Sequence, residues 1–85
     1  MTSLRSLMGI GPMMEKKLND VGIFSAEELK EIGSKEVYIM IKSRDPKVCA
    51  PHLYTLEGAI TDTKWNLLPT EVQEDLKKFS KEVVF

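Results

Sequence analysis

The stretch with the clearest chemical content covers residues 9–12, which read Gly-Ile-Gly-Pro. Glycine tolerates a positive φ, so two glycines around one aliphatic residue predict a tight hairpin. Proline suits the first position of a helix, because the amide hydrogen it lacks would be unpaired there. We therefore expect a helix to begin at Pro12. Its unpaired amides and positive dipole end would form a site suited to an anion.

A second candidate is the pair Cys49 and His52, the only cysteine and the only histidine. A thiol and an imidazole on one helical face could begin a nucleophile or a zinc site. A structural zinc usually takes four protein ligands and a catalytic zinc three, and the chain has no further Cys or His. A cysteine nucleophile also needs an orienting third group. We therefore expect a small packed cysteine, a histidine at a helix start, no metal or other cofactor, and no catalytic residue.

Glu57 and the methionines also have alternative interpretations. Glu57 lies in an apolar helix, and we expect it to cap a neighbouring helix or to pair with a lysine. Met8, Met13 and Met14 cluster around the hairpin. Met14 is expected in the core, whereas Met13 is the candidate for exposure and would then favour a protein partner.

Composition limits the class of protein. The chain has 85 residues, of which 42% are hydrophobic and 29% charged, and this balance predicts one globular domain over residues 1–85. A net charge of −1 gives no global attraction to nucleic acid or to an anionic membrane. No apolar run approaches the roughly 20 residues that a spanning helix needs. We expect a cytoplasmic protein with no membrane partner and no small-molecule substrate.

The elements that position these residues are expected to be helices, because the apolar spacing is helical nearly everywhere. The final segment carries an apolar stripe. Its start is marked by Thr70 and Gln73, which predict a capping box. The residues of that stripe are Val72, Leu76, Phe79 and Val83. Trp65 is expected to be buried between helices.

The middle of the chain contains further helix boundaries. Ser25 and Glu28 predict a capping box that opens a short helix, and Gly33 is expected to end that helix after about Ile32. Ser34 is expected to cap the next helix. The predicted fold is all-α, a compact bundle of five to six short helices around one core.

Residues 4 to about 29 resemble the helix-hairpin-helix motif, which we place at about residues 3–32. The hairpin glycines, the proline and both hydrophobic registers coincide with the motif. The resemblance implies sequence-independent DNA binding, in which the amides of the hairpin and of the following helix take a phosphate oxygen. The candidate DNA-phosphate-binding residues are Gly9, Ile10, Gly11, Met13, Met14, Lys16 and Lys17. The amides of Ile10, Gly11, Met13 and Met14 would be the donors, and the two lysines would be the supporting cations.

The sequence differs from DNA-binding hairpins at the positions after the second glycine. Lysine or arginine is frequent there, but this chain has Met13, Met14 and then Glu15. Residues 1–44 hold seven Lys or Arg against six Asp or Glu. We therefore expect DNA binding to be weak and strongly sensitive to salt.

A larger resemblance covers almost the whole chain. Residues 9–18, 22–29, 32–36, 49–60, 65 and 68–69 follow the order of segments in the C-terminal domain of the TfoX/Sxy competence regulators. Residues 53–60, Leu-Tyr-Thr-Leu-Glu-Gly-Ala-Ile, are the most distinctive part. The resemblance implies an all-helical fold and a bacterial cytoplasmic setting. It also implies a regulatory role in DNA-uptake competence when the domain follows the family's N-terminal domain.

Two functions stay open from the sequence. The first is a non-enzymatic regulatory or accessory module that binds DNA weakly through the hairpin. The second is a protein-protein interaction module, homodimeric or with another partner, in which the hairpin is only structural. In the second case the contact surface is expected near Met13 or Tyr38.

Overall fold

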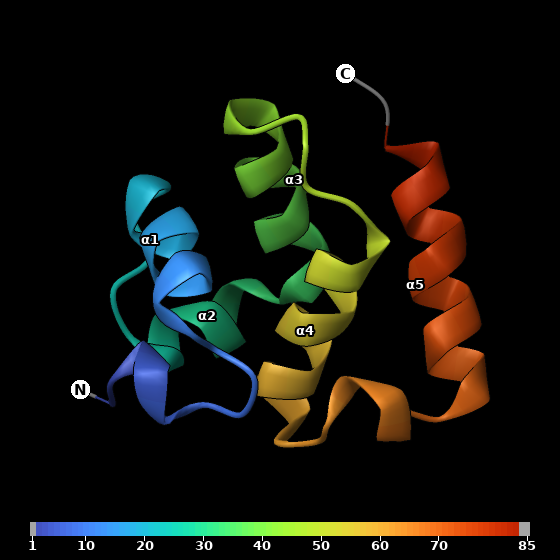
Figure 1. Ribbon diagram of the computed structural model, residues 1–85, viewed down its shortest axis with the longest axis horizontal. Coiled ribbons are helices and arrows are strands. Elements are labelled where there is room, and N and C mark those ends of the chain that lie inside the picture. The colour runs from blue at the N-terminus through green and yellow to red at the C-terminus, as the bar shows by residue number, and fades with distance from the viewer. Residues whose placement is uncertain (1, 84–85) are drawn as a thin grey trace.

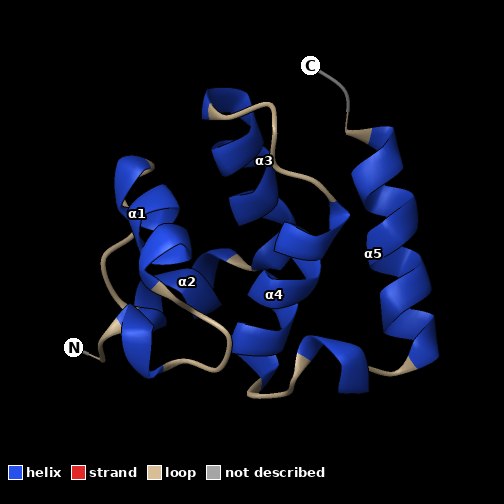
Figure 2. Cartoon of the chain, viewed as in Figure 1, coloured by secondary structure: helices blue, strands red, loops and turns tan. Residues whose placement is uncertain are grey.

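The computed structural model describes residues 2–83, and all regular structure in that range is helical (Figures 1 and 2). Five α-helices and two short 3-10 helices follow one another along the chain. They are η1 (Leu4–Ser6), α1 (Pro12–Asp20), α2 (Ala26–Ile32), α3 (Ser34–Arg44), α4 (Ala50–Thr61), η2 (Trp65–Leu67) and α5 (Thr70–Glu82). The predicted all-α fold is confirmed. No helix among these residues is long and apolar enough to cross a membrane.

Helix α4 lies at the centre of the molecule and contacts α2, α3, α5 and η2 (Figure 1). It buries Leu53, Leu56 and Ala59 completely, which makes it the apolar axis of the fold. Helix α1 packs against α3 on one side, and α5 covers α4 on the other. Tyr38 of α3, which the sequence did not indicate as core, is 1% exposed and meets Phe79 edge to face, with ring centroids 6.5 Å apart.

The predicted boundaries of α2 are confirmed. The Ser25 hydroxyl oxygen accepts the Glu28 backbone amide at 3.2 Å, and the hydroxyl donates to the Glu28 carboxylate at 3.1 Å. Gly33 ends the helix with a φ of 94°, a conformation that glycine adopts without strain.

The caps predicted for α3 and α5 are wrong. Thr70 is the first residue of α5 and Pro69 occupies the cap, while the Gln73 side-chain amide donates to the Leu68 carbonyl at 2.7 Å. Ser34 is likewise the first residue of α3, after Gly33. Its hydroxyl donates to the Glu57 carboxylate at 2.6 Å instead of capping its own helix. Glu57 therefore sits at the N-terminal end of α3, where a negative charge is favourable.

The predicted burial of Trp65 is also wrong, because 55% of this residue is exposed. The backbone after α4 turns back against Gly58, where a Cβ atom would lie 2.5 Å from the Thr63 carbonyl oxygen. The backbone of Trp65 takes part in the same contact, with its nitrogen 3.4 Å from that Cβ position. The Trp65 ring stacks on Tyr54 instead, with centroids 6.4 Å apart and planes 8° from parallel.

Candidate phosphate-binding hairpin

The chain turns before α1, where the Ile10 amide donates to the Leu7 carbonyl. We keep the name hairpin for residues 7–11, and only one of its two glycines needs to be glycine. Gly9 has a φ of 80°, whereas Gly11 has a φ of −98°, which other residues adopt readily. Ile10 points into the core and is 5% exposed. The segment before the hairpin forms only the 3-10 turn η1, so the first helix of the expected helix-hairpin-helix is a single turn.

Helix α1 begins at Pro12 as expected, and its first turn has unpaired donors. The first helical hydrogen bond runs from the Glu15 amide to the Gly11 carbonyl at 2.9 Å. Within residues 2–83, the amides of Gly11, Met13 and Met14 donate no hydrogen bond, and no side chain caps the helix. The amide of Ile10 is different, because it donates to the Leu7 carbonyl at 3.3 Å. Three of the four expected donors are therefore free.

These amides lie beside an open groove between α1 and α4. The hairpin and the start of α1 form one wall, and His52 and Thr55 of α4 form the other. The Thr55 methyl carbon lies 3.5 Å from the place where a Cβ of Gly9 would be, so hairpin and α4 are in close contact. Among the side chains of residues 2–83, none that lines this groove is acidic. An anion bound there would meet amide donors and no carboxylate.

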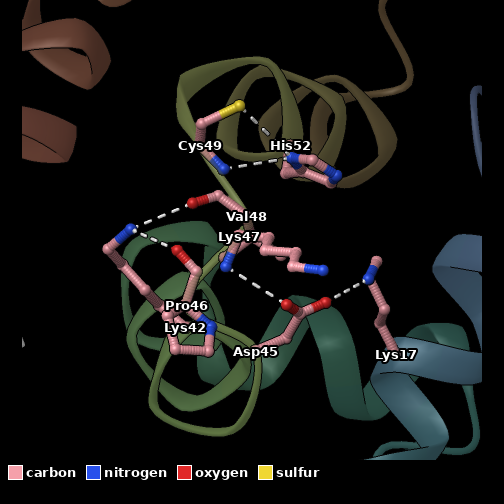
Figure 3. Close-up of polar contacts among 8 residues, drawn as sticks. All are labelled: Lys17, Lys42, Asp45, Pro46, Lys47, Val48, Cys49 and His52. Atoms are coloured by element: carbon pink, nitrogen blue, oxygen red, sulfur yellow. Dashed lines mark hydrogen bonds and ion pairs between the residues drawn. The ribbon is translucent and has the colours of Figure 1, made fainter.

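His52 contributes a further donor to the groove. Its Nδ1 accepts the Cys49 backbone amide at 3.1 Å (Figure 3). In the neutral ring the hydrogen is then on Nε2, which is free to donate. The Cys49 sulfur lies 3.8 Å from the same Nδ1, and together the two side chains cap α4. The structure thus brings this pair together as a helix cap.

Cys49 is exposed, so its expected packing in the interior is wrong. Cys49 is the N-cap residue of α4 and has an extended backbone, and its side chain faces outward. No group of three or more potential metal-ligating side chains occurs among the described residues.

The two predicted supporting lysines differ in their surroundings. Lys17 Nζ lies 2.6 Å from Asp45 Oδ2, and Asp45 also accepts the Lys47 backbone amide at 3.1 Å (Figure 3). The hydrogen bond from Lys17 lowers the pKa of Asp45 below its usual value. Lys16 is exposed and forms no ion pair within the described part of the chain. The free positive charge next to the hairpin is therefore that of Lys16.

Two further grooves adjoin the hairpin groove. One lies between α1 and α3 and shares Met13 and Lys17 with it. The other lies beside η2 and shares Gly9 and Thr55 with it. We call the three together the furrow. Its charged lining residues are Lys16, Lys17, Arg44, Lys64, Asp20 and Asp45, four cations against two carboxylates.

Sequence reasoning missed Arg44, Lys64 and Trp65 as neighbours of the hairpin. No local pattern connects them with residues 9–17, because the packing of α1 against α3 and of η2 against α4 brings them together. One signal was present for Trp65, which has the polar neighbours Lys64 and Asn66. Polar residues on both sides are more typical of an exposed aromatic than of a buried one.

Fold and site together define a small all-helical domain with a glycine hairpin in front of its first α-helix. The model of the TfoX C-terminal domain family matches residues 1–80, and the chain belongs to this family. Membership of this family indicates a regulatory or accessory domain. No curated protein matches the sequence significantly.

Two solved structures from Listeria monocytogenes are similar over nearly the whole chain. One is the triclinic form of an uncharacterized protein, with 38% identity, a TM-score of 0.93, and coverage of 95% of this chain and 92% of that one. The other is the tetragonal form of a protein of unknown function, with 39% identity, a TM-score of 0.92, and coverage of 94% and 98%. They support the all-helical fold.

Proposed function

We propose that this domain is a non-enzymatic regulatory or accessory module that binds the phosphate backbone of DNA weakly and without sequence preference. The observation that carries the proposal is the set of three unpaired amides, those of Gly11, Met13 and Met14. They lie at the positive end of α1, in a groove that no side-chain carboxylate of residues 2–83 lines. Family membership and the bacterial source of both similar structures support a setting in the bacterial cytoplasm, with competence regulation as the process.

The charges around the hairpin account for weak binding. Lys17 is held by Asp45, so its charge is largely compensated. Glu15 follows the hairpin, and the Arg5 guanidinium lies 3.9 Å from its carboxylate. This leaves Lys16, with Arg44 and Lys64 further along the furrow, as the main cations. With about three phosphate contacts, affinity for duplex DNA should fall about 40-fold between about 50 mM and 200 mM salt.

A titration of labelled duplex and single-stranded DNA at these two salt concentrations tests the proposal. The informative variant is Lys16→Glu with Arg44→Glu, which reverses two of the three main cations of the furrow. The matched control is Lys77→Glu with Lys78→Glu, which makes the same change of net charge on the exposed surface of α5. We expect the first variant to lose binding and the control to keep most of it. Absence of binding at the lower salt concentration, or equal losses in both variants, would refute the proposal.

One observation favours the alternative, a protein-protein interaction module with a structural hairpin. Met13 is 78% exposed beside the hairpin, where it offers an adaptable apolar contact. The other expected contact residue, Tyr38, is buried and cannot serve. Size exclusion with light scattering tests the homodimeric form. It predicts a mass above that of one chain, which Met13→Glu reduces to the monomer, and a monomeric parent protein would count against it.

A further inference from the structure

The exposed aromatic side chain of η2 is supported on one side by a neighbouring ring. Trp65 stacks on Tyr54 of α4 with nearly parallel rings, and 55% of it is exposed. The stack restricts the indole, so a further ring could pack on it with little additional loss of side-chain entropy. An exposed indole that stacks on a second ring beside a groove is suited to a flat ligand.

Trp65 also lies in the furrow and not on an isolated part of the surface. It lines the groove beside η2 together with Gly9 and Thr55, the two residues shared with the hairpin groove. Figure 1 shows the hairpin loop and η2 at the same end of α4. A chain-like ligand could therefore contact the hairpin amides and the indole at once.

The charge of the furrow indicates the chemistry of that ligand. Lys64 precedes Trp65 and lines the same groove, while Lys16 and Arg44 line the groove on the far side of the hairpin. Cations along a groove with an aromatic ring at one end suit a polyanion that carries flat rings. Single-stranded nucleic acid has this chemistry. Duplex bases are stacked inside the helix, where a side chain at a surface groove does not reach them.

We propose that the furrow binds single-stranded nucleic acid in preference to duplex, an inference that rests on the proposed function. The hairpin amides take a phosphate and Trp65 stacks on a base. The preference over duplex then comes from Trp65, whereas the contact with phosphate is common to both forms. Removing the indole should lower affinity for a single strand about tenfold, within the range for base–aromatic stacking, and should leave affinity for duplex unchanged.

Trp65 is the only tryptophan, so its emission reports on the stack directly. Unlabelled oligothymidylate, added to the whole chain at about 50 mM salt, should quench this emission saturably, and a blunt duplex should not. Anisotropy of labelled strands then compares Trp65→Ala with Trp65→Phe, which keeps a stacking ring. The matched control is Leu67→Ala, since Leu67 lies on the same 3-10 turn, is 66% exposed and does not line the furrow.

The outcomes separate this inference from the proposed function. A tenfold loss for the single strand in Trp65→Ala, with Trp65→Phe and Leu67→Ala near the parent, supports the inference. If Trp65→Ala and the parent bind the single strand equally, while the variant reversed at Lys16 and Arg44 still loses binding, the inference is overturned. The proposed function is then unaffected. No binding of either nucleic acid overturns both. Trp65 emission that changes with protein concentration alone would assign this surface to a second copy of the chain and overturn the inference.

Discussion

Residues of one type have different structural roles in this protein, and the glycines show it most clearly. Gly9 has a positive φ in the hairpin, which a side chain would disfavour. Gly58 lies inside α4 with an ordinary helical backbone, and it leaves room for the turn that places Trp65. Gly11 meets neither constraint, because nothing lies within 4 Å of the place where its Cβ would be.

Gly58→Ala is expected to lower the free energy of unfolding by about 1–3 kcal/mol, the usual cost of overpacking. The added Cβ would lie 2.5 Å from the Thr63 carbonyl oxygen, and a backbone atom cannot move aside cheaply. Urea unfolding followed by circular dichroism measures the change. The control is Gly11→Ala, which should stay within about 0.5 kcal/mol of the parent. Equal stability of the two variants would refute the close approach at Gly58.

The pH dependence of stability should contain a contribution from Glu27. Its carboxylate accepts the Thr2 backbone amide at 2.8 Å and the Thr2 hydroxyl at 2.8 Å. These bonds, the backbone one foremost, lower the pKa of Glu27 from 4.5 to about 2. Since the folded pKa lies below the unfolded one, the stabilisation is complete above pH 4.5 and is lost as pH falls towards 2.

Urea midpoints measured across this acid range should therefore fall more steeply in the parent than in Glu27→Gln, which cannot titrate at this position. Above pH 5 the difference between parent and variant should be constant. Parallel midpoint curves throughout the acid range would show that the contact with Thr2 does not form in solution.

At the scale of the elements, local sequence predicted those helix boundaries that depend on neighbouring residues. Pro12 begins α1, and Ser25 and Gly33 bound α2, because the relevant hydrogen bonds and φ angles are local. The cap predicted for α3 was wrong because of a contact with another helix, and the cap predicted for α5 was wrong because of the preceding proline. Glu57 of α4 takes the Ser34 hydroxyl, and Pro69 supplies the extended residue before α5. Contacts between helices are not visible in a local pattern.

Two cap variants test this distinction. Ser25→Ala removes the acceptor of the Glu28 amide and should destabilise the protein by about 1 kcal/mol. Thr70→Ala should be close to neutral, because Thr70 lies within the first turn of α5 and caps nothing. Thermal or urea unfolding of both variants gives the comparison. A larger loss of stability for Thr70→Ala than for Ser25→Ala would instead support the capping box that the sequence predicted at Thr70.

At the scale of the whole molecule, the hairpin was predictable and the furrow was not. The Gly-Ile-Gly-Pro spacing alone indicates a turn before a helix. The pairing of Lys17 with Asp45, and the approach of Arg44 and Lys64 to the hairpin, depend on how α1, α3 and α4 pack. This packing removes one expected cation from the hairpin and brings two others close to it. The positive character of the site is a property of the fold.

In the proposed function, the first turn of α1 binds phosphate through its backbone amides. Amide chemical shifts of the ¹⁵N-labelled protein, recorded during titration with an oligonucleotide at about 50 mM salt, test it most directly. We predict the largest shifts at the amides of Gly11, Met13 and Met14, with little change on the exposed surface of α5. Binding accompanied by unchanged amides at those three residues, or by shifts concentrated on α5, would contradict the account.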